Sequence, residues 1–216
     1  VSPSGFSDNI FVDIQPGQEW PYEYDIPLDH PPGTFWYHPH KHGSSSMQLF
    51  SGMCGALIVQ GGLDDVPEIA AARDLVYLIQ ELNVDGTGQV PNFTGTNFGL
   101  AGRRLLVNGE HQPVLKAFSG EVIRLRLING SVRTNIPFAI DDHSVHVASL
   151  DGITVPTLRT GPSVFMAPAG RSDILVRCQG VGLHAIKKLA DANNPQVDGE
   201  VILGFLEVLP EEVTMD

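Results

Sequence analysis

The sequence predicts an all-β protein, and three of its features support that prediction. Short runs rich in Val, Ile and Leu recur along the 216 residues at roughly the spacing found in a β-sandwich or β-barrel. Between these runs lie 23 glycines and 16 prolines, which favour turns. Several runs alternate apolar with polar residues, as half-buried strands do. A chain of this length has room for one large domain or two small ones.

The composition narrows the range of functions. Hydrophobic residues make up 42% of the chain and charged residues 18%, which is ordinary for a globular protein. Asp and Glu outnumber Lys and Arg by 25 to 13, and the net charge of −12 argues against a nucleic acid or an anionic membrane as partner. No apolar run is long enough to predict a membrane span. Only two cysteines occur, Cys54 and Cys178, and we expect both to be buried as small apolar residues.

The first part of the chain predicts a loop at residues 1–6 and then few regular elements. Residues 20–26 alternate aromatic or apolar with polar side chains, so a half-buried strand is expected there. After an aromatic strand that begins at Gly33, residues 43–51 favour a short helix capped by serines, with Met47 and Phe50 in the core. The last elements are a buried strand at 52–59 and a Gly-, Asp- and Pro-containing linker at 61–67.

The second part of the chain predicts a longer series of strands. A strand at 73–82 is followed by a Gly-, Asn- and Thr-rich loop at 85–102 and by a tight turn at Asn108-Gly109. Further strands are expected at 136–140, 145–150, 163–166, 173–176, 183–187 and 201–208, with turns at Asp151-Gly152 and 167–171.

The strand predicted at residues 120–129 has two chemically different faces. Its apolar residues at 123, 125 and 127 share one face, and Arg124 and Arg126 share the other. We expect the arginine face to be solvated and salt-bridged, in preference to forming an anion-binding site.

Two histidines separated by one residue follow the aromatic strand and are the strongest chemical signal. The aromatic run 35–37 favours a strand, and Pro39 biases His38 towards an extended conformation. In an extended chain, residues two apart share a face and their Cα atoms lie about 6.5 Å apart. His38 and His40 could therefore bind one metal together or two adjacent metals separately. A solvated His- and Lys-containing loop is one alternative, and a zinc site that includes His42 is another.

The motif Gly-Thr-Phe-Trp-Tyr-His-Pro-His-Lys-His-Gly at 33–43, with Met-Cys-Gly-Ala-Leu-Ile-Val at 53–59, resembles the end of the first cupredoxin domain of bacterial, laccase-like multicopper oxidases. The resemblance implies that His38 and His40 each bind a different copper of the type 3 pair, and that His42 is not a ligand. It also implies that Asp8 assists proton delivery to oxygen near the type 2 copper. A turn-forming role before Asn9 is the structural alternative for Asp8.

Four later motifs resemble the second, copper-free domain of the same oxidases: Leu-Val-Asn-Gly at 106–109, Arg-Leu-Arg-Leu-Ile-Asn at 124–129, Asp-Gly at 151–152 and Ala-Pro-Ala-Gly-Arg-Ser-Asp at 167–173. The resemblance implies two cupredoxin-like Greek-key β-barrel or sandwich domains. Residues 1–62 would be the C-terminal part of an N-terminally incomplete first domain, 63–72 a linker and 73–216 the second domain. The remaining copper ligands would lie outside this chain. His111, His143, His146 and His184 are expected to be structural.

The family takes single electrons from a phenol, an amine or a metal ion and reduces dioxygen to water. The resemblance therefore implies copper as cofactor, O2 and a small reducing substrate as partners, and a periplasmic or secreted location. With only His38 and His40 of the family's ligands, these 216 residues alone are expected to show no oxidase turnover. A non-catalytic copper-binding module of the same fold is the alternative, and the sequence is compatible with a homo-oligomer.

Overall fold

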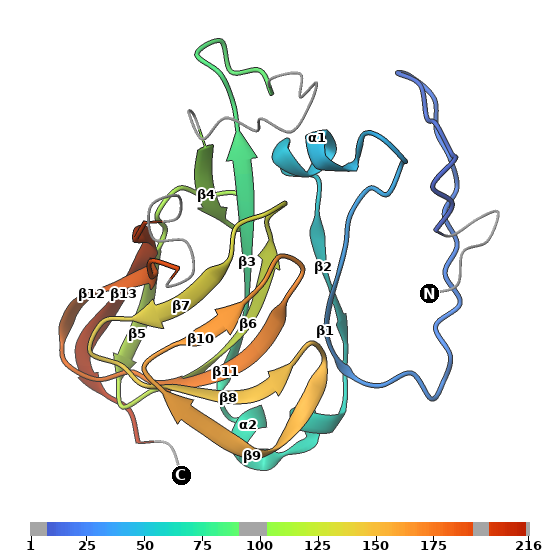
Figure 1. The fold of residues 1–216 in the computed structure, drawn as a ribbon. Helices are drawn as coiled ribbons and strands as arrows, with labels where there is room; N and C mark the ends of the chain where they lie inside the picture. Colours follow the sequence, from blue (N-terminus) through green and yellow to red (C-terminus); the bar gives the residue numbers. More distant parts are fainter. Residues whose placement is uncertain (1–7, 91–102, 192–198, 215–216) are drawn as a thin grey trace.

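The computed structural model describes residues 8–90, 103–191 and 199–214, and nearly all of its regular structure is β (Figure 1). The expected loop at 1–6 and much of the loop at 85–102 lie outside the described residues. A two-stranded sheet near the N-terminus leans against a sandwich of a six-stranded and a five-stranded sheet. The prediction of an all-β, cupredoxin-like fold is confirmed.

The two-stranded sheet consists of β1 (Gly33–Tyr37) and β2 (Gly55–Val59), which run antiparallel. Helix α1 (Ser45–Phe50) lies between them in the chain. Gly55 faces Tyr37 across the sheet, and a Cβ at Gly55 would collide with the tyrosine ring. Glycine at this position therefore lets the aromatic strand pair closely with β2.

Two details of this first region differ from the sequence prediction. Residues 20–26 form no strand, and Trp20 and Tyr24 are 42% and 52% exposed. An alternating pattern becomes a strand only when a neighbour pairs with its backbone, and no described strand pairs with these residues. The helix is present, but the Ser44 side chain makes no capping hydrogen bond. Phe50 is buried as expected, whereas Met47 is 36% exposed.

The sandwich begins after two short helices, η1 (Gly62–Asp65) and α2 (Pro67–Ala70), which occupy the predicted linker. The six-stranded sheet has the spatial order β4 (Arg103–Val107), β3 (Arg73–Asn83), β6 (Val122–Gly130), β11 (Arg171–Arg177), β8 (Val145–Leu150) and β9 (Ile153–Gly161). The five-stranded sheet has the order β10 (Val164–Met166), β7 (Ile136–Ile140), β12 (Gly182–Lys188), β13 (Val201–Glu212) and β5 (Val114–Ser119).

The core lies between the two sheets and is built from the apolar faces of the predicted strands. Ile123, Leu125 and Leu127 of β6 are fully buried there, together with Phe138 of β7. Strands β4, β5 and β9 are not among the predicted elements. All three lie at sheet edges and include exposed residues, so their apolar pattern is weak.

The turns expected at Asn108-Gly109 and Asp151-Gly152 are both confirmed. The backbone φ angles are 50° and 84° in the first pair and 51° and 80° in the second. Two successive positive φ angles identify the turn type that joins antiparallel strands tightly.

The expectation of a solvated arginine face on β6 is wrong, although the expected salt bridges are present. Arg124 and Arg126 are each only 3% exposed. They form ion pairs with Asp64 of η1, Asp74 of β3 and Asp173 of β11. The two arginines are buried because the first region and η1 cover this face, which a pattern within one strand does not reveal.

Candidate metal centre

The histidine pair lies immediately after β1, where Pro39 ends the strand because it has no backbone N–H to donate. The ring centroids of His38 and His40 are 5.6 Å apart, with the rings at 74° to each other. The Trp36 ring stacks on His38 at 4.4 Å between centroids. Trp36 of the aromatic strand therefore restricts the His38 ring by stacking, and the His40 ring lies next to it.

Hydrogen bonds select the same nitrogen of both imidazoles. His38 Nδ1 is 2.9 Å from the carbonyl oxygen of Pro39, and His40 Nδ1 is 2.6 Å from Asp8 Oδ1. A carbonyl and a carboxylate accept hydrogen bonds, so Nδ1 is the donating nitrogen in each ring. The lone pair of each Nε2 is then available to a metal, and neutral imidazole is a suitable copper ligand. The two side chains therefore fit a metal-binding role.

The contact between Asp8 and His40 joins residues 32 positions apart in the chain. Both residues carry signals in the sequence, but no local pattern indicates that they touch. The Asp8 side chain is 34% exposed and the His40 side chain 56% exposed. The carboxylate orients His40 and is also open to water.

The three-histidine zinc site is not formed. His42 is exposed, and its backbone N–H donates to the carbonyl of Ile10 at 2.9 Å. Within residues 8–90, 103–191 and 199–214, no three His, Cys, Asp or Glu side chains are grouped so as to hold a metal ion. The described part of the chain thus offers two adjacent imidazoles.

Three histidines of the sandwich, His143, His146 and His184, have local partners. His143 Nδ1 donates to the carbonyl of Asp141 at 2.7 Å, and its Nε2 accepts from the backbone N–H of Gln179 at 3.2 Å. The ring of His143 packs edge-on against His184, and His146 contacts the Thr160 hydroxyl. These contacts are of the kind expected for structural histidines.

Both cysteines are free thiols. Cys178 is fully buried as expected, and burial raises its pKa to about 12, with Glu121 adding to the shift. Cys54 is only partly buried, and burial also raises its pKa. Both thiols therefore remain protonated at neutral pH.

Comparisons with known proteins agree over nearly the whole chain. Two family models described as multicopper oxidase match residues 4–63 and 80–208. The multicopper oxidase mco of Staphylococcus haemolyticus is 28% identical over 165 residues, which cover 76% of this chain and 36% of that protein. Cell division protein FtsP of Escherichia coli is 28% identical over 155 residues, covering 70% of this chain and 33% of that protein.

Solved structures show the same fold. A multicopper oxidase from Campylobacter jejuni superposes with a TM-score of 0.76 and 24% identity over 94% of this chain and 43% of that one. McoA from Aquifex aeolicus gives a TM-score of 0.78 and 23% identity over 93% and 47%.

The chain spans about a third of the length of these curated relatives. No helix of the described residues is long and apolar enough to cross a membrane. The family model at 80–208 alone matches more than half of the residues. The chain belongs to the multicopper oxidase family.

Proposed function

We propose that His38 and His40 each bind a different copper of a type 3 pair in an oxidase that reduces O2 to water. The observation that carries this proposal is the pair of hydrogen bonds to Nδ1, from His38 to Pro39 and from His40 to Asp8, which leaves two adjacent Nε2 atoms free. Family membership supports copper as the metal.

Each residue of the site has a distinct task. Copper supplies one-electron redox chemistry when bound, which suits a phenol, an aryl amine or a low-valent metal ion as reducing substrate. His38 and His40 provide the imidazole ligands, and Trp36 limits the movement of the first ring. Asp8 orients His40 through Oδ1 and, because its carboxylate is reachable by water, serves as a group that holds and passes a proton at its other oxygen, Oδ2.

The organisation of the chain is part of the same proposal. Residues 1–62 are the C-terminal part of a first cupredoxin-like domain, 63–72 a linker and 73–216 a second domain without copper. The second domain carries the first one and keeps the histidine pair in place. The proposed location is the periplasm or the cell exterior.

Copper content tests the assignment of the ligands. His38→Ala and His40→Ala, made in the full chain, are each expected to lower copper uptake strongly, because each removes one imidazole ligand. His146→Ala is the matched control, since His146 lies on β8 and contacts Thr160. Equal copper content in all four proteins, measured by metal analysis after dialysis, would overturn the assignment.

A non-catalytic module is the second candidate function. It is favoured by the relatives named Cell division protein FtsP, which match between 70% and 76% of this chain. Because these 216 residues alone are expected to show no turnover, the coding sequence on either side of them separates the two. An upstream His-x-His and a downstream His-Cys-His support the oxidase, and stop codons directly on both sides support the module.

A further inference from the structure

The beginning of β1 is fixed to the sandwich by one buried threonine. Thr34 is fully buried, and its hydroxyl donates to Asp173 Oδ1 of β11 at 2.6 Å. Its backbone carbonyl accepts from Nε of Arg171 at 3.2 Å. A single residue of the first region therefore makes both a side-chain and a backbone hydrogen bond to the same sandwich strand.

The residues on either side of Thr34 also fit closely against the sandwich. A Cβ built on Gly33 would lie 3.0 Å from the carbonyl oxygen of Gly152. A Cβ on Gly152 would lie 3.1 Å from the ring of Phe35, and the Arg171 guanidinium is 5.8 Å from the centre of that ring. Two of the motifs noted in the sequence, Asp151-Gly152 and 167–173, thus form the surface on which β1 rests.

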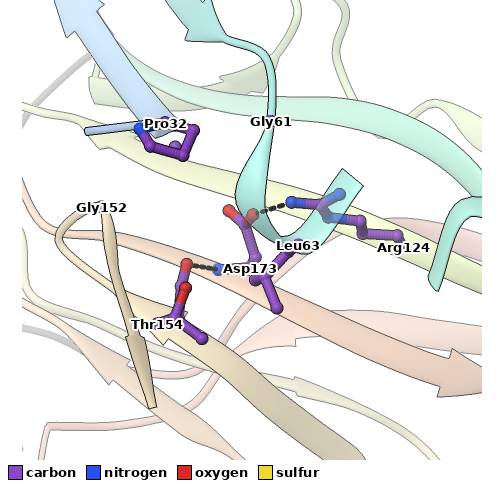
Figure 2. A pocket seen from close by; sticks show the side chains of 9 residues that line it. Pro32, Gly61, Leu63, Arg124, Gly152, Thr154 and Asp173 are labelled. Carbon is purple, nitrogen blue, oxygen red and sulfur yellow. Dashed lines mark hydrogen bonds and ion pairs between the residues drawn. The ribbon is translucent and has the colours of Figure 1, made fainter. Parts of the chain in front are cut away.

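Asp173 is itself held in place by charge. It is 1% exposed and forms an ion pair with Arg124, whose guanidinium also pairs with Asp64 of η1. Figure 2 shows the Arg124 and Asp173 side chains facing each other beneath Pro32 and Gly61, beside the turn at Gly152. A buried carboxylate with a fixed guanidinium partner has little freedom to move, so it is a rigid acceptor for the threonine hydroxyl.

The histidine pair lies between this attachment and a second one. On the far side of His38 and His40 in the chain, the Gln80 side chain of β3 donates to the carbonyl of Gly52 at 2.9 Å. A two-stranded sheet is at best marginally stable alone, so β1 depends on these attachments for its orientation. From Thr34 to His38 an extended strand covers about 13 Å, short enough to carry a displacement to the imidazoles.

We propose that Thr34, hydrogen-bonded to Asp173 and Arg171, is a positioning residue for the His38–His40 metal site. The inference rests on the proposed function. It assigns to the copper-free domain the task of holding the histidine strand at a fixed place. Thr34 touches no metal and acts only through β1.

The test compares Thr34→Val, which keeps the shape but removes the hydroxyl, with Thr34→Ser, which keeps the hydroxyl. In the full chain, Thr34→Val is expected to speed amide exchange in β1 and β2 by about tenfold or more, because a hydrogen bond to a buried carboxylate is lost. It is also expected to weaken copper binding by about tenfold and to alter the optical absorption spectrum of the bound copper. Thr34→Ser should restore all three.

Two further variants keep the test decisive. Thr160→Val changes an exposed threonine on β9 in the same way and should leave exchange in β1 and copper binding unchanged. If Thr34→Val does not fold, Gly152→Ala crowds the ring of Phe35, the next residue of β1, and should loosen β1 and weaken copper binding.

The outcomes separate this inference from the proposed function. If the unaltered chain takes up no copper, the proposed function fails. If it takes up copper and the Thr34→Val chain binds copper equally well with the same spectrum, the proposed function stands and the positioning role is wrong. Unchanged exchange in β1 and β2 would equally overturn the positioning role.

Discussion

The two parts of the molecule differ in how much buried apolar core each contains. The sandwich at 73–212 surrounds a continuous core in which side chains such as Leu125 and Phe138 are fully buried. The region at 8–59 contains one two-stranded sheet, and many of its large apolar side chains are exposed, Phe11 to 83%. The candidate metal centre lies in the region at 8–59, which has little core of its own. Its geometry therefore depends on contacts with a part of the molecule that has no proposed chemistry.

A polar cluster lies where the linker and the first region meet the sandwich, unlike the apolar core of the sandwich. Arg124 and Arg126 meet the carboxylates of Asp64, Asp74 and Asp173 where η1 and β1 lie on β6 and β11. Burying charges costs free energy unless each has a partner, so this interface tolerates little change in register. We infer that the polar interface gives the histidine region a defined position, while the apolar core supplies most of the stability.

The largest expected effect is a cavity in the sandwich core. Phe138→Ala removes a fully buried ring that packs edge-on against Tyr77 and should lower the free energy of unfolding by about 4 kcal/mol. Phe11→Ala, the matched change in the exposed first region, should cost about 0.5 kcal/mol or less. Urea unfolding measures both, and equal losses would contradict the contrast between the two parts.

The next largest effect is expected at the interface between the two parts. Arg124→Met removes the nearer guanidinium partner of the buried Asp173 carboxylate, leaving only Arg126 at 3.8 Å, and should cost about 3 kcal/mol. Lys116 pairs with Glu207 on the surface, where its side chain is 68% exposed, and Lys116→Met should cost about 1 kcal/mol or less. Equal losses of unfolding free energy for the two substitutions would mean that the buried ion pairs stabilise the fold no more than a surface pair does.

Acid should weaken the same interface. Burial acts to raise the pKa of Asp64, but hydrogen bonds from the Gly61 N–H and from Arg124 and Arg126 outweigh it, so the pKa is lowered. A carboxyl group with a lowered folded-state pKa stabilises the fold above its unfolded-state pKa of about 3.9, and this contribution disappears as the pH falls through the folded-state pKa. Stability should therefore drop below about pH 4.

The Asp64→Asn variant tests the acid effect, because it has no carboxyl group to titrate at this position. Its free energy of unfolding should be lower at neutral pH and should fall less steeply on acidification. Unfolding measured across the acid range compares the two proteins, and parallel pH profiles would show that Asp64 is not the titrating group.

The smallest expected effect distinguishes backbone strain in a turn from the packing of β1 on that turn. Gly109 and Gly152 occupy the same position in two similar turns, with φ of 84° and 80°. A Cβ at Gly109 would meet nothing within 4 Å, whereas one at Gly152 would press on Phe35 of β1. Gly109→Ala should cost about 1 kcal/mol from the backbone alone, and Gly152→Ala should cost more. Equal losses of unfolding free energy would mean that the Phe35 contact yields without strain.

Local sequence patterns were sufficient to predict most strands and turns of the sandwich. The strands expected at 136–140 and 145–150 coincide with β7 and β8, and the turns at Asn108-Gly109 and Asp151-Gly152 have the expected backbone. Such elements are visible in sequence because alternation and turn chemistry act over a few neighbouring residues. The same pattern at 20–26 gave a wrong strand, because pairing requires a partner that no local signal specifies.

The sequence by itself determined the all-β class, the family and the two histidines on one extended segment. Only the tertiary structure decided which nitrogen each imidazole leaves free, because the partner that selects it for His40 is Asp8, 32 residues away. Tertiary structure also decided that Arg124 and Arg126 are buried and that Thr34 reaches Asp173 across 139 residues. Burial and long-range hydrogen bonds are properties of assembled elements, so the sequence of one strand cannot specify what covers it.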